Sequence, residues 1–189
     1  IRMTDVELRW PYLWTCRTGS NASNFDTIQW NQINVNAGTP SVVQTNEYTL
    51  TDSHLWMADC TSDYNQNFVI GFNRASAVGP VYVGAYVAGR QTGDPVNTLT
   101  GPLTVKAGEK RYENGLLQSG YYRWGDYNGV SIDPNGCDIW VNIEYVRNRA
   151  TSPPSTGVED TSWIANYRFA DCSVTPSAYL NKVDYFCVD

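Results

Sequence analysis

The sequence predicts an all-β fold, and three observations support this prediction. Only 17% of the 189 residues are charged and 13% are aromatic, a composition that favours pleated strands over helices. Apolar and polar residues alternate along most of the chain, whereas helical periodicity is almost absent. Clusters of Asn, Gly, Pro and Asp interrupt the alternation, as turns do between strands. The length is sufficient for one domain with a substantial core.

The first strands are expected in the N-terminal third of the chain. Residues 6–16 form the first alternating segment, in which Pro11 marks an edge strand or a bulge. Residues 25–35 alternate most regularly. Residues 40–50 follow a Gly-Thr-Pro turn and complete this group.

Five further segments predict strands in the rest of the chain. They alternate or carry short apolar runs, and they cover residues 67–73, 81–89, 101–108, 137–146 and 162–172. The breaks between all these strands are rich in turn-forming residues. Residues 150–160 are the most linker-like break, and they are short enough to form a surface loop within one domain.

An internal repeat relates residues 55–75 to residues 123–145. Each copy has a Trp, then an Asp, an Asn- and Gly-rich turn and an alternating strand, and Asp63 and Asp133 lie 70 positions apart. Antiparallel strand sets that repeat in this way are typical of propeller blades. An ordinary β-sandwich is the alternative.

The stretch RWGDYNGVSIDPNGCDIWVNIEY (123–145), followed by TSWIANYRF, resembles the C-terminal blades of secreted bacterial sialidase-like β-propeller proteins. The resemblance spans residues 30–169, and residues 123–133 are its most specific part. It implies four-stranded blades in a radial array. Because 189 residues supply about three blades and closed propellers use about four to eight, we expect a partial or assembled propeller.

The domain organisation follows from this expectation. Residues 1–189 are either a single all-β domain or the C-terminal part of a larger propeller, which starts at Ile1 as a processed form or a fragment. Another chain or another copy would then complete the fold, giving a homo-oligomer or a mixed assembly. Residues 173–189 are a possible closing or docking tail, because residues 181–188 can add as a strand to an open edge.

Net charge and cysteine content restrict the compartment and the partners. A net charge of −6 argues against binding to nucleic acid or to anionic membranes. The sequence contains no apolar run of about 18 residues, so it predicts no membrane span.

Without a C-x-x-C pair and with one His, the chain is unsuited to zinc or iron–sulfur binding. Scattered cysteines predict two disulfides and one remaining thiol in a secreted, extracellular or cell-surface protein. The spacing does not choose the pairing among Cys16, Cys60, Cys137, Cys172 and Cys187.

The ligand-binding candidates lie close together in the sequence. They are Tyr122, Arg123, Trp124, Asp126 and Tyr127. Aromatic faces can stack on sugar rings, while Arg and Asp side chains can hydrogen-bond to hydroxyl groups. This pattern predicts a carbohydrate site.

Asp126 and Asp133 offer a weaker alternative. Their carboxylates, together with backbone oxygens, are of the type that binds Ca²⁺, although no cofactor is required. The structural interpretation is that Asp133, followed by Pro-Asn-Gly, accepts backbone hydrogen bonds in a β-turn. Trp124 and Trp140 are then expected in the core between blades.

Catalysis is the remaining possibility. The resemblance implies an Arg cluster that binds the substrate carboxylate and a Tyr–Glu nucleophile pair. The arginines near strand ends that can converge are Arg74, Arg90, Arg123 and Arg168, and Tyr127 with Glu144 can be imagined as the pair. No catalytic role carries over, because these residues do not map one by one onto the family's motif.

The sequence therefore predicts a non-enzymatic scaffold or binding module, for glycans or for assembly. A sialidase-type glycoside hydrolase is the alternative.

Overall fold

The computed structural model describes residues 5–36, 38–76, 78–112, 117–118, 121–148 and 158–173. Within these residues every regular element is a β-strand, so the predicted all-β fold is confirmed. The strands form three antiparallel sheets and one short two-stranded pair. No helix in the described part of the chain is long and apolar enough to cross a membrane.

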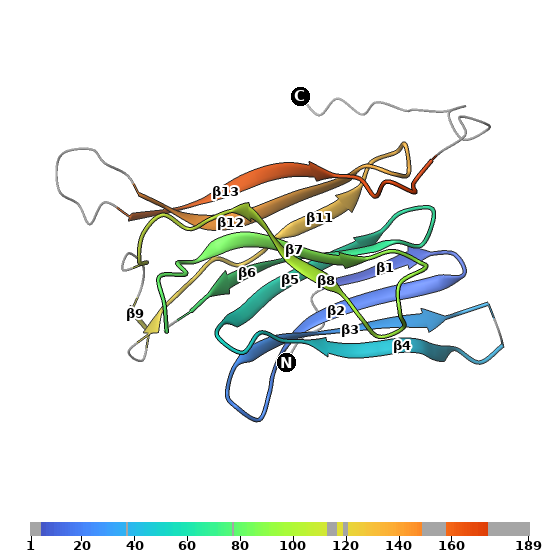
Figure 1. Ribbon diagram of the computed structural model, residues 1–189, viewed down its shortest axis with the longest axis horizontal. Coiled ribbons are helices and arrows are strands. Elements are labelled where there is room, and N and C mark those ends of the chain that lie inside the picture. Colours follow the sequence, from blue (N-terminus) through green and yellow to red (C-terminus); the bar gives the residue numbers. More distant parts are fainter. Residues whose placement is uncertain are drawn as a thin grey trace.

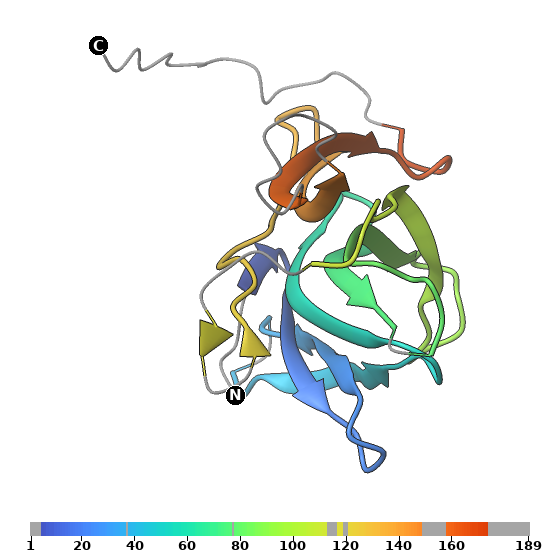
Figure 2. The ribbon, with the colours of Figure 1, turned by 90° about the vertical axis from the view of Figure 1, so that its left-hand side faces the viewer.

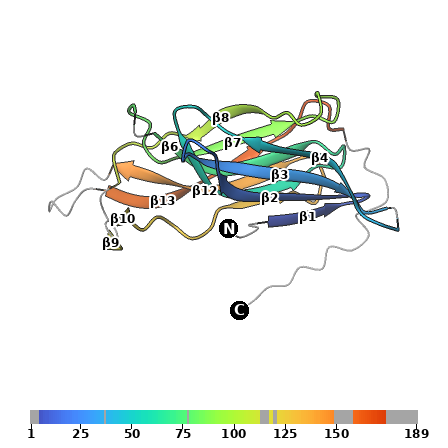
Figure 3. The same cartoon turned by 90° about the horizontal axis from the view of Figure 1, so that it is seen from below.

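The first two sheets each contain four consecutive strands in sequence order. Sheet 1 consists of β1 (Asp5–Arg9), β2 (Tyr12–Ser20), β3 (Asp26–Asn34) and β4 (Ser41–Tyr48). Sheet 2 consists of β5 (His54–Ser62), β6 (Phe68–Ala75), β7 (Gly84–Arg90) and β8 (Thr100–Lys106). Figure 3 shows the strands of sheet 1 side by side in this order.

The third sheet and the short pair come from the C-terminal half. Sheet 3 consists of β11 (Gly129–Ile132), β12 (Ile139–Asn148) and β13 (Val158–Tyr167). The pair is formed by β9 (Leu117–Gln118) and β10 (Tyr121–Tyr122), and Figure 2 shows it beside the stacked sheets. This arrangement is consistent both with partial propeller blades and with stacked sandwich layers.

Sheet 2 is the middle layer of the molecule (Figure 1). Because side chains alternate across a strand, β6 uses Phe68, Ile70 and Phe72 against sheet 1 and Val69 against sheet 3. Two separate hydrophobic cores result, one on each face of sheet 2. The run of buried residues along β6 is therefore explained by burial on both faces.

The observed strands correct several expectations. The single strand predicted for residues 6–16 is two strands, because the chain turns between β1 and β2. The strand β5 was not predicted, since a bulge at Met57 (φ 52°) interrupts its alternation. Trp140 is not in the core; it lies on the outer face of sheet 3 and is 44% exposed.

Asp133 is a structural corner, as the turn chemistry predicts. It follows β11 directly, and its Oδ1 accepts a hydrogen bond from the Asn135 N–H (2.9 Å). Asp63 follows β5 in the same way, with its Oδ1 accepting from the N–H groups of Asn65 and Asn67 (2.9 Å each). The two members of the sequence repeat are thus equivalent Asx-type turns.

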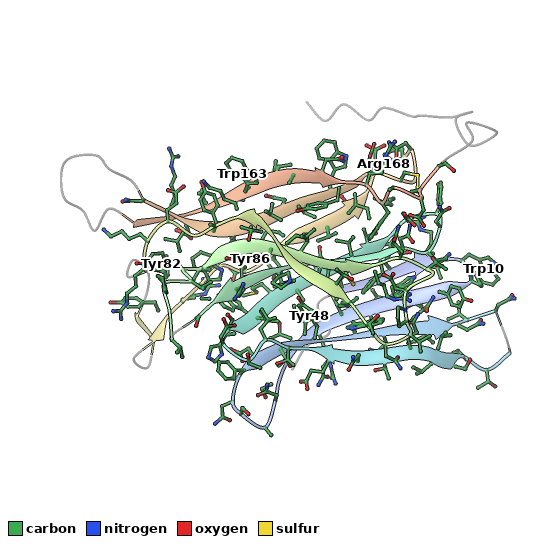
Figure 4. All side chains as sticks on the ribbon, in the orientation of Figure 1. Trp10, Tyr48, Tyr82, Tyr86, Trp163 and Arg168 are labelled. Atoms are coloured by element: carbon green, nitrogen blue, oxygen red, sulfur yellow. A yellow bond between two sulfur atoms is a disulfide. The ribbon has the colours of Figure 1, made fainter. Side chains whose placement is uncertain are left out.

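These two corners lie together at one end of the sheets. The Tyr64 N–H donates to the Gly136 carbonyl (3.0 Å), and Gly136 has a positive φ of 78° with the Tyr64 ring against it, so no other residue fits there without strain. A disulfide, Cys137–Cys172, joins this end to the segment after β13. Figure 4 shows Trp10 and Arg168 at the same end and Tyr82 at the opposite end. The disulfide is consistent with an extracellular location.

Of the predicted tail, residues 174–189, including Cys187, lie outside the described residues.

Candidate functional site

The predicted ligand-binding segment lies at the end of the sheets opposite the two corners, where β5 begins and β6 ends. Its side chains divide between two cavities. Tyr122 and Trp124 line one cavity, whereas Arg123, Asp126 and Tyr127 line the other. We call the first the aromatic groove and the second the acidic pocket. The structure therefore does not bring the five predicted residues into one site.

The aromatic groove is an open cavity of about 600 Å³. Trp56, Tyr122 and Trp124 supply its aromatic surface, and Thr18, Asp26 and His54 supply polar groups. These side chains come from the β2–β3 hairpin, from the start of β5 and from β10 with the segment after it. A pocket with mostly apolar walls and a few polar groups is the usual form of a small-molecule site.

Hydrogen bonding and ring packing fix the position of Trp124. Its indole Nε1–H donates to Oδ1 of Asn73 (3.2 Å), and the Tyr112 ring packs edge-on against it with centroids 4.9 Å apart. Tyr112 also packs edge-on against Tyr122 (6.3 Å). An aromatic wall held in this way loses little conformational entropy when a ligand stacks on it.

The bulge in β5 orients Trp56. The register of β5 with β6 shifts between Trp56 and Asp59, so that Leu55 still faces the core while Trp56 lines the groove. The carbonyl of Met57, at the bulge, accepts a hydrogen bond from Asn128 Nδ2 (2.8 Å). Bulges often redirect a side chain beside a functional site.

Asp26 and His54 form the polar rim of the groove. His54 Nδ1 lies 3.0 Å from Oδ2 of Asp26, and both side chains are partly exposed, at 38% and 50%. The Phe25 ring packs against His54 with centroids 5.0 Å apart. The pair therefore offers hydrogen-bonding groups to a ligand in fixed positions.

The acidic pocket has a volume of about 370 Å³. Three carboxylates line it, those of Asp126, Glu144 and Asp160, together with Arg123 and two tyrosines, Tyr112 and Tyr127. Arg123 forms an ion pair with Asp126. Tyr127 is 86% exposed.

Burial raises the pKa of Glu144, and the nearby charges of Asp160 and Asp126 raise it further. Gly125, with a φ of 21°, allows the chain to approach this carboxylate, because a Cβ at that position would overlap Glu144 Oε2. A carboxyl group that stays protonated more readily than usual can act as a general acid.

The other three predicted arginines do not reach Arg123. Arg74 donates to Ser53 Oγ (2.9 Å), Arg90 donates to the Asp94 carbonyl (2.8 Å), and Arg168 makes two hydrogen bonds to Asp138 (2.6 and 2.7 Å). The structure therefore contains no cluster of these arginines that could bind a carboxylate.

The two aspartates considered for calcium lie on either side of β11, a strand of four residues that spans about 13 Å. Asp126 pairs with Arg123, and Oδ2 of Asp133 accepts from Trp140 Nε1 (3.0 Å). Across the described part of the chain there is no group of three or more His, Cys, Asp or Glu that could hold a metal ion.

Sequence reasoning missed Thr18, Trp56 and Asp26 in the groove and Tyr112 and Asp160 in the pocket. Their positions in the chain give no signal, because only the fold brings these distant segments together.

Comparison with known proteins gives no further assignment. No protein-family model matches the chain. Neither a curated protein nor a solved structure is significantly similar to it.

Proposed function

We propose that the protein is an extracellular, non-enzymatic carbohydrate-binding module. The observation that carries this proposal is the aromatic groove, in which Trp56, Tyr122 and Trp124 surround one open cavity with Asp26 and His54 at its rim. The C–H groups of a sugar face pack well on indole and phenol rings. The rim can accept and donate hydrogen bonds to sugar hydroxyls.

The ligand is a neutral glycan. The polar rim contains a carboxylate, and the chain has a net charge of −6, so an anionic sugar is repelled. The experiment is a glycan array that carries neutral oligosaccharides of glucose, galactose and N-acetylglucosamine beside sialylated ones. Binding to a neutral class supports the proposal. Binding to sialylated glycans alone, or to none, contradicts it.

A glycoside hydrolase is the second candidate function, and the acidic pocket favours it. Glycosidases use two carboxyl groups, one of which has a raised pKa; Glu144 and Asp160 share the pocket, and the pKa of Glu144 is raised by burial. The test is a panel of fluorogenic glycosides, including a sialoside. Turnover that disappears in Glu144→Gln and Tyr127→Phe favours the hydrolase; no turnover in the wild type excludes it for that panel.

Assembly with a second copy complements the binding role. In the register of sheet 1, Leu8 pairs with Leu13, Leu13 with Ile33, and Ile33 with Val42, which gives an apolar row across four strands. Leu8 is 55% exposed and Val42 60% exposed. Sheets 1 and 2 bury apolar rows of this kind against one another, so we propose that a sheet of a second copy packs over this exposed row of sheet 1. Light scattering of wild type and Leu8→Lys tests this: we expect a dimer or larger particle that Leu8→Lys dissociates, and a monomeric wild type contradicts it.

A further inference from the structure

Two cysteines face each other in the core between sheets 1 and 2. Cys16 lies on β2 and Cys60 on β5, and these two strands pack directly against each other. Both side chains belong to the same hydrophobic cluster and are 1% and 0% exposed. Their thiols are hydrogen-bonded to one another. Among the described residues, Cys16 and Cys60 are the two cysteines that do not belong to the Cys137–Cys172 disulfide.

We propose that Cys16 and Cys60 are the site of a second disulfide, which joins sheet 1 to sheet 2 in the mature protein. The geometry supports this because the two strands come from facing layers and the two thiols are hydrogen-bonded to each other. With Cys137–Cys172 as the other bridge, Cys187 is the remaining thiol of the five cysteines. The proposal does not depend on the glycan-binding function.

The reaction needs an oxidant of the disulfide class, such as glutathione disulfide. One cysteine thiolate attacks the glutathione disulfide, forms a mixed disulfide and releases one glutathione. The second cysteine thiolate then attacks the protein sulfur of that mixed disulfide and releases the second glutathione. The two protein thiols lose two electrons and two protons in total, and two glutathione thiols are formed.

The timing of the reaction follows from burial. Burial raises the pKa of the Cys60 thiol well above its usual value, and the adjacent Cys16 and the charges of Asp5 and Asp59 act in the same direction. The thiolate is the reacting species, and a buried thiol does not meet glutathione. The bridge therefore forms while the chain folds, before sheets 1 and 2 close.

The consequence for the fold is a cross-link between its two N-terminal layers. Sheets 1 and 2 are otherwise held together by side-chain packing and by non-covalent contacts such as the Arg9–Ser62 hydrogen bond and the His54–Asp26 pair. The existing disulfide fastens only the corner of sheet 3. A Cys16–Cys60 bridge closes the loop from residue 16 to residue 60, and this closure restricts the conformations of the unfolded chain. The oxidised protein should then unfold at a higher urea concentration than the reduced one.

The primary experiment maps the disulfides of the full-length chain refolded with glutathione disulfide. The protein is unfolded in acidic guanidinium without reductant, alkylated and digested for mass spectrometry. We expect one cross-linked peptide that contains Cys16 and Cys60, a second that contains Cys137 and Cys172, and alkylation at Cys187. Alkylation of both Cys16 and Cys60, or a link from either to Cys187, overturns the proposal.

Two controls sharpen the result. Protein folded with all thiols reduced, and only then exposed to glutathione disulfide, should form the Cys16–Cys60 link far more slowly than the unfolded chain; an equal rate contradicts formation during folding. Cys60→Ala, a small change for a buried cysteine, should lower the urea midpoint of the oxidised protein towards that of the reduced wild type. The matched variant Cys187→Ala should leave the midpoint unchanged.

Discussion

The aromatic groove and the acidic pocket share one short stretch of chain, yet they offer a ligand opposite chemistry. Tyr122 and Trp124 point to the groove, and Arg123, Asp126 and Tyr127 to the pocket. In the groove, rings are held by hydrogen bonds and edge-on packing. In the pocket, carboxylates exceed the single arginine, which is already paired. A single sequence motif can thus form two surfaces, and the first is the one that we propose stacks on an uncharged ligand.

The buried amide of Asn73 links the two regions, and its removal should have the largest effect. Asn73 is fully buried; it accepts hydrogen bonds from Trp124 and Asn128 and donates to the carbonyls of Gly84 and Glu144. Asn73→Ala removes these four hydrogen bonds, and only Asn128 keeps another acceptor, the Met57 carbonyl. We therefore expect a loss of about 3 kcal/mol in the free energy of unfolding.

Urea denaturation measures this loss, and glycan binding should weaken in the same variant because Trp124 loses its anchor. Asn128→Ala is a smaller truncation of the same network and serves as the comparison. An Asn73→Ala protein with wild-type stability would show that the network does not hold the two regions together.

The next effect is a pH dependence that belongs to neither cavity. Asp59 lies between the sheets, where burial and then the charge of Asp5 raise its pKa to about 7, although Val130 N–H donates to it (2.6 Å). The folded state therefore holds this proton more tightly than the unfolded state. The contribution of Asp59 to the free energy of unfolding is therefore fully present below about pH 4 and is lost as the pH rises towards 7.

Asp59→Asn removes that titration and keeps an acceptor for the Val130 N–H. We expect the variant to be more stable than wild type at pH 8 by about 2 kcal/mol and to lose much of the difference at pH 4. Urea midpoints at both pH values provide the measurement. If Asp59→Asn left the pH profile of the urea midpoint unchanged, the pKa of Asp59 would not be raised in the folded protein.

The smallest effect is expected in the acidic pocket. The pKa of Glu144 is raised by burial, Asp160 and Asp126, so its ionisation also opposes folding as the pH rises. Glu144→Gln should stabilise the protein at neutral pH by less than about 1 kcal/mol, since the neighbouring charges are partly screened by solvent. Thermal unfolding at pH 5 and pH 8 shows the difference, and glycan binding should stay the same. A loss of glycan binding would move the ligand site from the groove to the pocket.

The sequence predicted the repeating features of the fold better than its interruptions. Alternation located most of the strands, and the Asp-Pro-Asn-Gly turn correctly indicated a structural corner at Asp133. The bulge at Met57 concealed β5, because one extra residue reverses the alternation that marks a strand. Trp140 was wrongly expected in the core, since sequence periodicity does not tell which sheet lies outermost.

The candidate site was predictable only in part. Tyr122 and Trp124 are close in the sequence and line the same cavity, whereas Arg123, which lies between them in the sequence, lines the other. Adjacent residues of an extended segment face opposite sides, which separates Arg123 from Tyr122 and Trp124. Asp126 is separated from Trp124 by Gly125, whose positive φ of 21° interrupts the extended backbone. Trp56 and Asp26 join the groove through tertiary contacts that no local pattern records.

The most direct test of this account is isothermal titration calorimetry with the neutral oligosaccharide that binds best on the array. Wild type is compared with Trp56→Ala in the groove and Tyr127→Ala in the pocket, each checked for folding by thermal unfolding. We predict that Trp56→Ala weakens binding about tenfold or more, which corresponds to about 1.4 kcal/mol, and that Tyr127→Ala binds like wild type. Unchanged affinity in Trp56→Ala, or a loss confined to Tyr127→Ala, would contradict the central role of the aromatic groove.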